Sequence, residues 1–376
     1  MRVFVTGPDD EGRRLDRILR RLLPAAPLSA IYRALRTGRI RVDDGKASGR
    51  RRVQAGETIT IPRELDVGAP PVDETGQPAR SREENKKGRR ESSAPPDSGR
   101  PSGMTGPGTP STGAALEVIT TGPHLIAVNK LAGTPTHGPG SLQRLVAEHL
   151  REAAAASLAF RPAPLHRLDR GTSGIVICAA TLHGARRFSE LLRTGRIGKW
   201  YIALLGCRLS APAHWRDHLV RDPASGLTRV ARAEDGRGAP AKLTVFPLLH
   251  TGRSEISLAA IRLETGRRHQ IRAQAAARGC TLAGDRRYGS PGRTPYLLHA
   301  IRIELAGDTE LLGRPIVTAP LPPEAAARLE RLFGSGSAGA VTELFSPGQL
   351  APHDLTAFAS AHRLQPENSP PQSPGP

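Results

Sequence analysis

One long stretch of this chain, residues 64–114, lacks the side chains needed to build a core. It has almost no large apolar residues and is rich in Gly, Pro, Ser and charged residues. Such a segment buries too little apolar surface to offset the entropy of ordering it. We therefore expect a disordered linker there, between a small module over 1–63 and a larger domain over 115–333. The segment 334–376 begins with Gly-Ser-Gly-Ser and ends in Pro-rich sequence, which predicts a flexible C-terminal tail.

Positive charge is concentrated in the first module. The 376 residues include 54 Lys+Arg and 35 Asp+Glu, a formal net charge of +19. Residues 13–52 alone hold 13 basic and 3 acidic side chains, which gives 13 − 3 = +10. This charge fits either a solvated helical face or a surface that binds nucleic acid. Apolar spacing predicts a helix over 15–23 and a second helix that begins after an N-cap at Ser29, followed by strands over 40–42 and 58–61.

The cysteines and the apolar runs indicate in which cellular compartment the chain is expected. Cys178, Cys207 and Cys280 are odd in number and far apart, which argues against a disulfide framework or a cysteine zinc site. The longest apolar run, residues 175–180, is much shorter than the roughly 18 residues of a membrane span. We expect a cytoplasmic chain with no membrane partner.

A second candidate for metal binding is a pair of histidines. His214 and His218 are four residues apart, but Pro212 and Trp215 favour a loop at this position. No third ligand lies nearby in the sequence, so we expect no metal site there.

The polar loop 165–174 is the most distinctive segment of the larger domain, because it leads directly into the apolar strand predicted over 175–180. Asp169 lies between Arg167 and Arg170 in this loop. Its carboxylate either pins the loop through an ion pair or carries chemistry, and the local sequence does not separate the two. Further apolar patterns predict strands over 118–119, 125–130, 198–206, 241–249 and 255–263, and helices near 142–150, 181–194 and before Gly279.

Several blocks of the chain occur in an order typical of one enzyme family. They are His166-Arg167-Leu168-Asp169 with Thr172-Ser173-Gly174; Lys199-x-Tyr201; Thr265-Gly266-Arg267-x-His269-Gln270-Ile271-Arg272; Gly284-Asp285 with Tyr288-Gly289; and Leu298-His299-Ala300. Residues 118–305 resemble the RluA-type pseudouridine synthases, which isomerise uridine in RNA. The first module contains Arg14-Leu15-Asp16-Arg17, the run from Ser29 to Val42 and Ala55-Gly56-Glu57. On these segments, residues 12–62 resemble the alpha-L RNA-binding domain. The resemblance implies an α+β fold with a mixed, largely antiparallel sheet and flanking helices, plus the small N-terminal alpha-L module.

The resemblance also implies roles for three residues. Asp169 would be the catalytic aspartate, Tyr201 the active-site tyrosine and Arg272 the arginine that pairs with the aspartate. The carboxylate would either add to the anomeric carbon of the ribose or assist proton removal from the neighbouring sugar carbon. The isomerisation involves no net electron transfer, so we expect no cofactor and no metal. We expect His166 and His269 to pack the loops rather than act as bases.

The predicted partner is RNA, most simply large-subunit ribosomal RNA or an assembling large subunit, bound by a monomer. Arginines would contact its phosphates. The candidates are Arg14, Arg17, Arg33, Arg36, Arg39 and Arg41 in the first module and Arg167 and Arg267 in the larger domain. Three departures from the family pattern, at Gly171, Arg268 and Gln274, bear on which uridine is modified.

A different class of function remains open at this point. A non-catalytic RNA-binding or ribosome-assembly protein could retain the same fold. Such a protein has no reason to keep Asp169, Tyr201 and Arg272 together, and this combination favours the enzyme. A ribonuclease would need paired histidines or a carboxylate cluster, and the sequence suggests neither.

Overall fold

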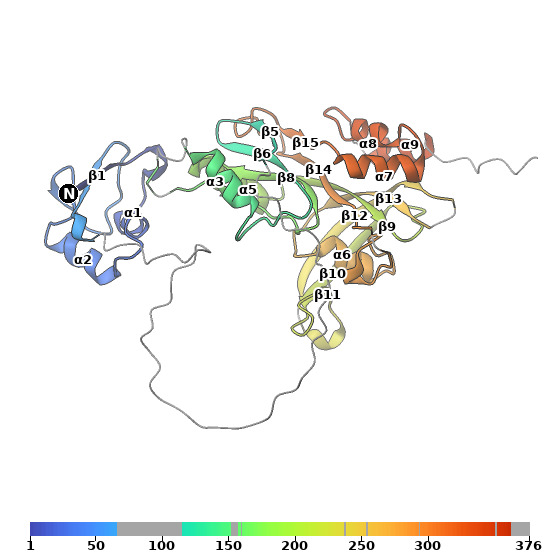
Figure 1. Cartoon of the computed structure of the whole chain (residues 1–376), viewed down its shortest axis with the longest axis horizontal. Helices are drawn as coiled ribbons and strands as arrows, with labels where there is room; N and C mark the ends of the chain where they lie inside the picture. Colours follow the sequence, from blue (N-terminus) through green and yellow to red (C-terminus); the bar gives the residue numbers. More distant parts are fainter. Residues whose placement is uncertain are drawn as a thin grey trace, which may run out of the picture. The chain divides into compact units, whose positions relative to one another are not determined.

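The computed structural model describes residues 1–65, 115–151, 157–158, 160–236, 238–252, 255–292, 294–349 and 352–361. They form two compact units (Figure 1), each of which we describe separately. Within this part of the chain no helix has both the length and the apolar character that a bilayer span requires. The linker predicted over 64–114 lies outside the described residues, except for Glu64 and Leu65, which end a short 3-10 helix.

The first unit packs two helices against a four-stranded sheet of order β1-β4-β2-β3. The apolar faces of the two helices and of the sheet form one core. It includes the completely buried Leu15, Ile18 and Ile31 on the helices and Ile59 on β4. The second helix begins at Leu28, one residue before the predicted cap. The elements are β1 (Arg2–Val5), η1 (Pro8–Asp10), α1 (Leu15–Leu22), α2 (Leu28–Arg36), β2 (Arg41–Val42), β3 (Gly45–Lys46), β4 (Thr58–Ile61) and η2 (Arg63–Leu65).

Ser157 and Leu158 also belong to the first unit, although they lie within the larger domain predicted over 115–333. The hydroxyl of Ser157 and the N–H of Leu158 donate to the two carboxylate oxygens of Asp10, at 2.9 and 2.8 Å. Asp10 is fully buried, and these bonds help to satisfy its charge. The boundary at 115 therefore does not separate the two units completely.

The second unit is built on an eleven-stranded sheet. Its main order is β11-β10-β12-β13-β9-β14-β8-β6-β5, with β15 on β14 and β7 on β8. Among the described strands only β8 and β14 pair in parallel, so the predicted mixed, largely antiparallel sheet is confirmed. The strands are β5 (Val118–Thr121), β6 (Leu125–Lys130), β7 (Ala163–Pro164), β8 (Ser173–Ala179), β9 (Gly198–Leu205), β10 (Ala213–Arg221), β11 (Thr228–Val230), β12 (Ala239–His250), β13 (Ser257–Leu263), β14 (Leu298–Glu304) and β15 (Ile316–Thr318).

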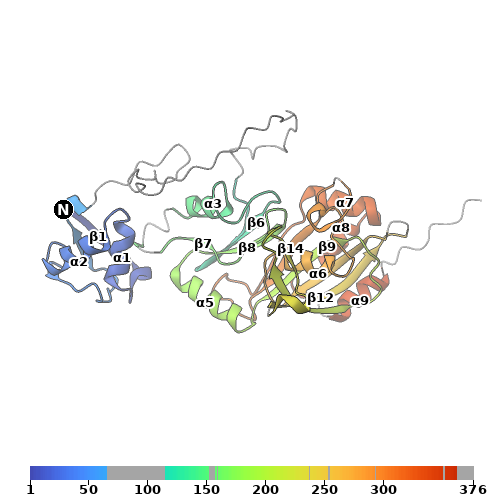
Figure 2. The same cartoon turned by 90° about the horizontal axis from the view of Figure 1, so that it is seen from below.

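Helices cover both faces of this sheet. Because side chains alternate along β9, Tyr201 faces the core beneath α3 and α6, while Trp200 faces the core beneath α7, α8 and α9. Figure 2 shows α3 and α5 on opposite sides of β6 and β8. The helices are α3 (Leu142–His149), α5 (Leu182–Arg193), α6 (Gln270–Ala276), α7 (Pro323–Phe333), α8 (Ser337–Leu344) and α9 (Pro352–Ala361), with the short η3 (Ala233–Asp235) and η4 (Arg286–Tyr288).

The prediction of a flexible tail from 334 onward is wrong for the residues of α8 and α9. Phe345 and Leu355 are 0% and 1% exposed, and the Phe345 ring contacts the ring of Trp200 at a centroid distance of 6.3 Å. Apolar residues recur at helical spacing in this segment, and the Gly-Ser start concealed that pattern. Residues 362–376 lie outside the described part of the chain.

The prediction against disulfides is also wrong for one pair, because Cys207 and Cys280 are bonded to each other. They are 73 residues apart in the sequence. The end of β9 and the segment after α6 are neighbours, since the N–H of Gly206 donates to the carbonyl of Thr281 at 2.7 Å. Cys178 is free and buried, as its position in an apolar strand suggests.

The segment with His214 and His218 is strand β10 rather than a loop. Residues four apart along a strand share a face but are roughly 13 Å apart, too far to share a metal ion. This strand spacing is a different reason from the predicted loop to expect no metal site at this pair.

Candidate active site

Hydrogen bonds to a neighbouring segment hold the loop that carries Asp169. The N–H of Gly133 donates to the carbonyl of Arg170 at 2.7 Å, and Nε of Arg170 donates back to the carbonyl of Gly133 at 2.8 Å. The hydroxyl of Thr136 donates to the carbonyl of Leu168 at 2.9 Å. Arg170 thus pins the loop through Gly133, which leaves the Asp169 carboxylate, 14% exposed, turned toward other partners.

Two glycines allow close approaches of this segment to neighbouring atoms. Gly174 has φ +108°, and a Cβ there would lie 2.3 Å from the carbonyl oxygen of Ala300 on β14. A Cβ at Gly171 would lie 2.6 Å from the hydroxyl of Tyr296. The departure from the family pattern at 171 is thus accompanied by a tyrosine hydroxyl packed against the backbone.

Arg272 on α6 links two carboxylates. Its Nη1 lies 3.4 Å from Oδ2 of Asp169, as the family resemblance implies. Its shorter contacts are to Asp285, which accepts from Nε at 2.6 Å and from Nη2 at 2.8 Å. Tyr288 and Tyr296 lie with their ring centroids 4.8 Å from the guanidinium carbon, so Arg272 is also held by cation–π contacts. Asp285 belongs to one of the motif blocks, but the sequence predicts no role for it, because its pairing with Arg272 depends on the fold.

Two more nitrogen groups accompany Asp169. Lys130, 1% exposed, donates to the carbonyls of Leu131 at 3.0 Å and Thr134 at 2.8 Å. Burial lowers the pKa of its ammonium to about 8, and the negative charge of Asp169 opposes this shift. Nε2 of His269 lies 3.8 Å from Oδ1 of Asp169.

His269, the N-cap of α6, has a strained backbone conformation. Its φ is +51°, which a non-glycine residue seldom adopts, and its Nδ1 lies 3.0 Å from the hydroxyl of Tyr288. Burial lowers the pKa of its imidazole. The expectation that it only packs a loop understated its position beside Asp169. His166, in contrast, packs as predicted: its Nε2 accepts the N–H of Ile177 at 3.0 Å, and burial lowers its pKa to about 3.

Tyr201 reaches the same place from β9. Its side chain belongs to the core beneath α6 and the residue is 7% exposed. Burial, with a smaller contribution from the charge of Asp169, raises the pKa of the phenol well above its usual range. The side chain therefore stays a neutral phenol at physiological pH.

One cavity of about 440 Å³, a volume typical of small-molecule sites, lies at this place. Asp169, Tyr201 and Arg272 all contribute to its wall, and the exposed Arg167 and Arg267 lie on its lining. A carboxylate, a phenol and a buried guanidinium thus meet in a cavity whose lining also includes exposed arginines.

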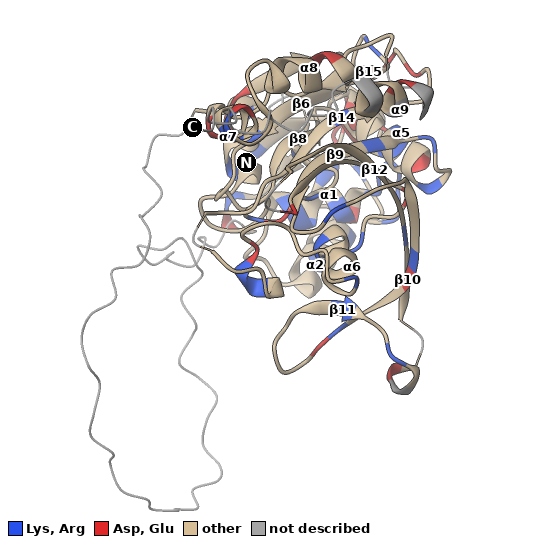
Figure 3. Ribbon diagram, turned by 90° about the vertical axis from the view of Figure 1, so that its right-hand side faces the viewer, with Lys and Arg blue, Asp and Glu red and all other residues tan. Residues whose placement is uncertain are grey.

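The six arginines proposed for the first unit differ in their surroundings. Arg17, Arg33 and Arg36 are exposed on α1 and α2. Figure 3 shows Lys and Arg in blue on these helices. Arg14 is committed to a salt bridge with Asp16 at 2.6 Å, and its pKa is raised chiefly by that hydrogen bond. Arg39 pairs with Glu64, and Nε of Arg41 donates to the Gly38 carbonyl at 3.0 Å.

Two further departures from the family pattern occupy different environments. Gln274 is completely buried, and its amide nitrogen donates to Asp217 at 2.6 Å. Arg268 is exposed beside the cavity. Gln274 therefore serves packing and hydrogen bonding, while Arg268 is accessible to a bound molecule.

Comparison with known proteins supplies independent information. The family model described as RNA pseudouridylate synthase matches residues 124–277, which include Asp169, Tyr201 and Arg272. The chain is 28% identical over 303 residues to the ribosomal large subunit pseudouridine synthase C of Salmonella typhimurium and to that of Escherichia coli K12, which covers 77% of this chain and 80% of each relative. The Pasteurella multocida protein of the same name is 26% identical over 343 residues, or 86% of this chain and 91% of that one.

Proposed function

We propose that this chain belongs to the RNA pseudouridylate synthase family and converts uridine to pseudouridine in large-subunit ribosomal RNA. The observation that carries the proposal is the meeting of Asp169, Tyr201 and Arg272, from a loop, a strand and a helix, in one cavity. Relatives whose names specify the large ribosomal subunit support this class of RNA as the substrate.

In this reaction the bond between the ribose anomeric carbon and uracil N1 breaks, and a bond from that carbon to uracil C5 forms. The proton lost from C5 is balanced by one gained at N1, so the product is an isomer of the substrate. The carboxylate of Asp169 either adds to the anomeric carbon or takes a proton from the neighbouring sugar carbon. Both routes need a negative charge there, and Arg272 and Lys130 provide compensating positive charge.

The target base must leave its stack to reach the cavity. Tyr201 offers it an aromatic face, and its neutral phenol can donate a hydrogen bond. Arg167 and Arg267 at the cavity, with the exposed arginines of the first unit, supply phosphate contacts that do not depend on sequence. This division assigns affinity to the arginines and chemistry to Asp169.

The test is to incubate the protein with a large-subunit ribosomal RNA transcript and to map pseudouridine chemically. We expect wild type to form it and Asp169→Asn to form none, with RNA affinity within a few fold of wild type. Glu324→Gln, an exposed isosteric change on α7, is the matched control and should retain turnover. Tight binding without product in wild type would refute the enzyme and favour a non-catalytic RNA-binding protein.

We also propose that the enzyme acts as a monomer in the cytoplasm. Light scattering with size-exclusion chromatography measures the oligomeric state. Comparing naked transcript with partly assembled large subunits determines which form of the RNA is modified faster.

A further inference from the structure

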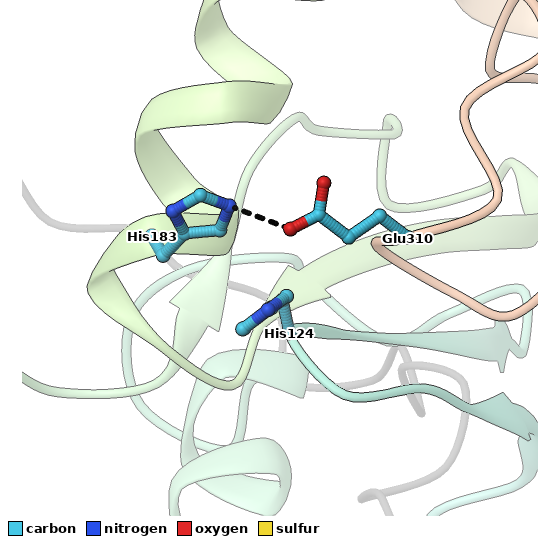
Figure 4. A group of neighbouring side chains, drawn as sticks. All are labelled: His124, His183 and Glu310. Carbon is cyan, nitrogen blue, oxygen red and sulfur yellow. Dashed lines mark ion pairs between the residues drawn. The ribbon is translucent and has the colours of Figure 1, made fainter.

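Three segments far apart in the sequence bring two imidazoles and a carboxylate together, away from the residues that line the catalytic cavity (Figure 4). His124 follows β5, His183 lies in the first turn of α5, and Glu310 lies in the loop between β14 and β15. One ligand atom from each lies within 4.8 Å of the others. We propose that this cluster binds a zinc ion, which cross-links the three segments.

Backbone hydrogen bonds already fix the positions of the segments. The carbonyl of His124 accepts from the N–H groups of Ala180 and Thr181, at 3.0 and 3.3 Å, just before α5. The N–H of His124 donates to the carbonyl of Leu311, at 3.2 Å, beside Glu310. The site therefore does not have to be assembled from mobile parts.

Two further contacts hold the start of α5 close to His124 and to the loop that carries Glu310. A Cβ at Gly184 would lie 2.3 Å from the carbonyl oxygen of His124, so only glycine permits this approach. Nε of Arg187 pairs with Asp308 at 3.1 Å, and the Asp308 side chain is 5% exposed. This ion pair joins the helix to the loop as well.

The imidazole of His124 has the partner that metal-binding histidines usually have. Its Nδ1 lies 3.1 Å from the hydroxyl oxygen of Thr181, which also accepts the N–H of Gly184 at 3.1 Å. Donation from Nδ1–H to this oxygen leaves Nε2 with the lone pair that a metal requires. The tautomer in which Nδ1–H donates to Thr181 is therefore the one that can bind zinc.

The other two ligands can adjust. Nε2 of His183 lies 3.5 Å from Oε1 of Glu310, and the side chains are 55% and 67% exposed. Ligands of a tetrahedral zinc ion, at about 2.1 Å from the metal, are roughly 3.4 Å apart. One pair already has this spacing, and small rotamer changes bring in the third.

The donor set selects the metal class. Two neutral imidazoles and one carboxylate suit Zn²⁺, with water in the fourth position, whereas Mg²⁺ and Ca²⁺ prefer oxygen ligands alone. α5 also contributes Phe188 and Leu192 to the wall of the catalytic cavity, so the ion would fix a helix that shapes that cavity. It would take no part in the isomerisation.

The experiment uses full-length protein without an affinity tag, freed of metal by chelation and titrated with ZnCl₂ by calorimetry. We expect one zinc ion per chain and, with Co²⁺ in place of zinc, the absorption spectrum of tetrahedral cobalt. His183→Ala and Glu310→Gln should each weaken zinc binding at least tenfold. Both residues are exposed, so the fold should tolerate these changes.

His218→Ala is the matched control, because it removes an exposed imidazole outside the cluster and should leave zinc binding unchanged. Zinc should also raise the unfolding temperature of wild type and not that of His183→Ala. Absence of saturable one-to-one binding, or equal affinity in wild type and His183→Ala, would overturn the proposal. These readouts do not involve RNA, so they are independent of the proposed isomerase activity.

Discussion

Arg272 shares one guanidinium between two carboxylates, and its shorter bonds go to Asp285 rather than to Asp169. Asp285 therefore serves as a positioning residue that orients Arg272 beside Asp169. Asp285→Asn keeps the shape but removes the charge. We expect a loss of about 3 kcal/mol in the free energy of unfolding and at least a tenfold fall in kcat, with KM for RNA little changed. Urea unfolding and single-turnover pseudouridine formation measure the two effects, and a normal kcat would contradict the positioning role.

Lys130 gives the protein a distinctive pH dependence at the scale of one residue. Its pKa is lowered from 10.5 to about 8 by burial, so the unfolded chain binds an extra proton between these values. Linkage then makes the free energy of unfolding rise with pH, because the cost of burying the ammonium disappears as it deprotonates. The rise attributable to Lys130 is about 2 kcal/mol between about pH 7.5 and about pH 9.5.

Lys130→Met removes the titrating group and should lose this part of the rise. Urea unfolding of both proteins at the two pH values measures the difference. Other groups contribute equally to both proteins, so identical pH dependence in wild type and variant would show that the folded lysine has an ordinary pKa.

At the scale of elements, α8 and α9 complete the core of the second unit rather than trail from it. Val341, Leu344 and Phe345 on and after α8 are buried against that core. Nη1 of the buried Arg302 donates to the carbonyls of Phe345 at 3.1 Å and Ser346 at 2.8 Å. The segment after α8 therefore satisfies a charge inside the protein.

A chain that stops after residue 336 should lose this structure. Removing several buried apolar side chains at about 1.5–3 kcal/mol each approaches the total stability of a domain, roughly 5–15 kcal/mol. We expect the truncated protein to be insoluble or to lack a cooperative thermal transition. A chain that stops after residue 361 keeps both helices and should melt like wild type; equal melting of the two truncations would contradict the packing role.

At the scale of the whole molecule, contiguous patterns were predictable and distant pairings were not. The bounds of β4 and β6 follow from apolar runs bounded by turns, and the motif around Asp169 is continuous in the sequence. The role of Asp285 depends on how the turn after α6 folds back onto Arg272. The bond between Cys207 and Cys280 joins ends that are adjacent only because β9 and the segment after α6 lie side by side. Local periodicity carries no information about either contact.

Removing positive charge from the first unit tests whether that unit supplies RNA affinity while the second unit supplies the chemistry. Arg17, Arg33 and Arg36 are exposed on the first unit, so replacing all three with Gln should leave its core intact. If each contacts one phosphate, the plot of log affinity against log salt should become less steep by about 0.7–0.9 per contact. Turnover at saturating RNA should stay near that of wild type, because the cavity is unchanged.

Asp169→Asn provides the converse variant, with turnover lost and the salt slope unchanged. Filter binding at several salt concentrations, with pseudouridine mapping at saturating RNA, separates the two effects. An unchanged slope in the triple variant would assign the phosphate contacts to the second unit, where Arg167 and Arg267 line the cavity. The charged side chains of residues 13–52 would then be solvated and would not bind the RNA. Exposed charge contributes to RNA binding only where it contacts phosphates.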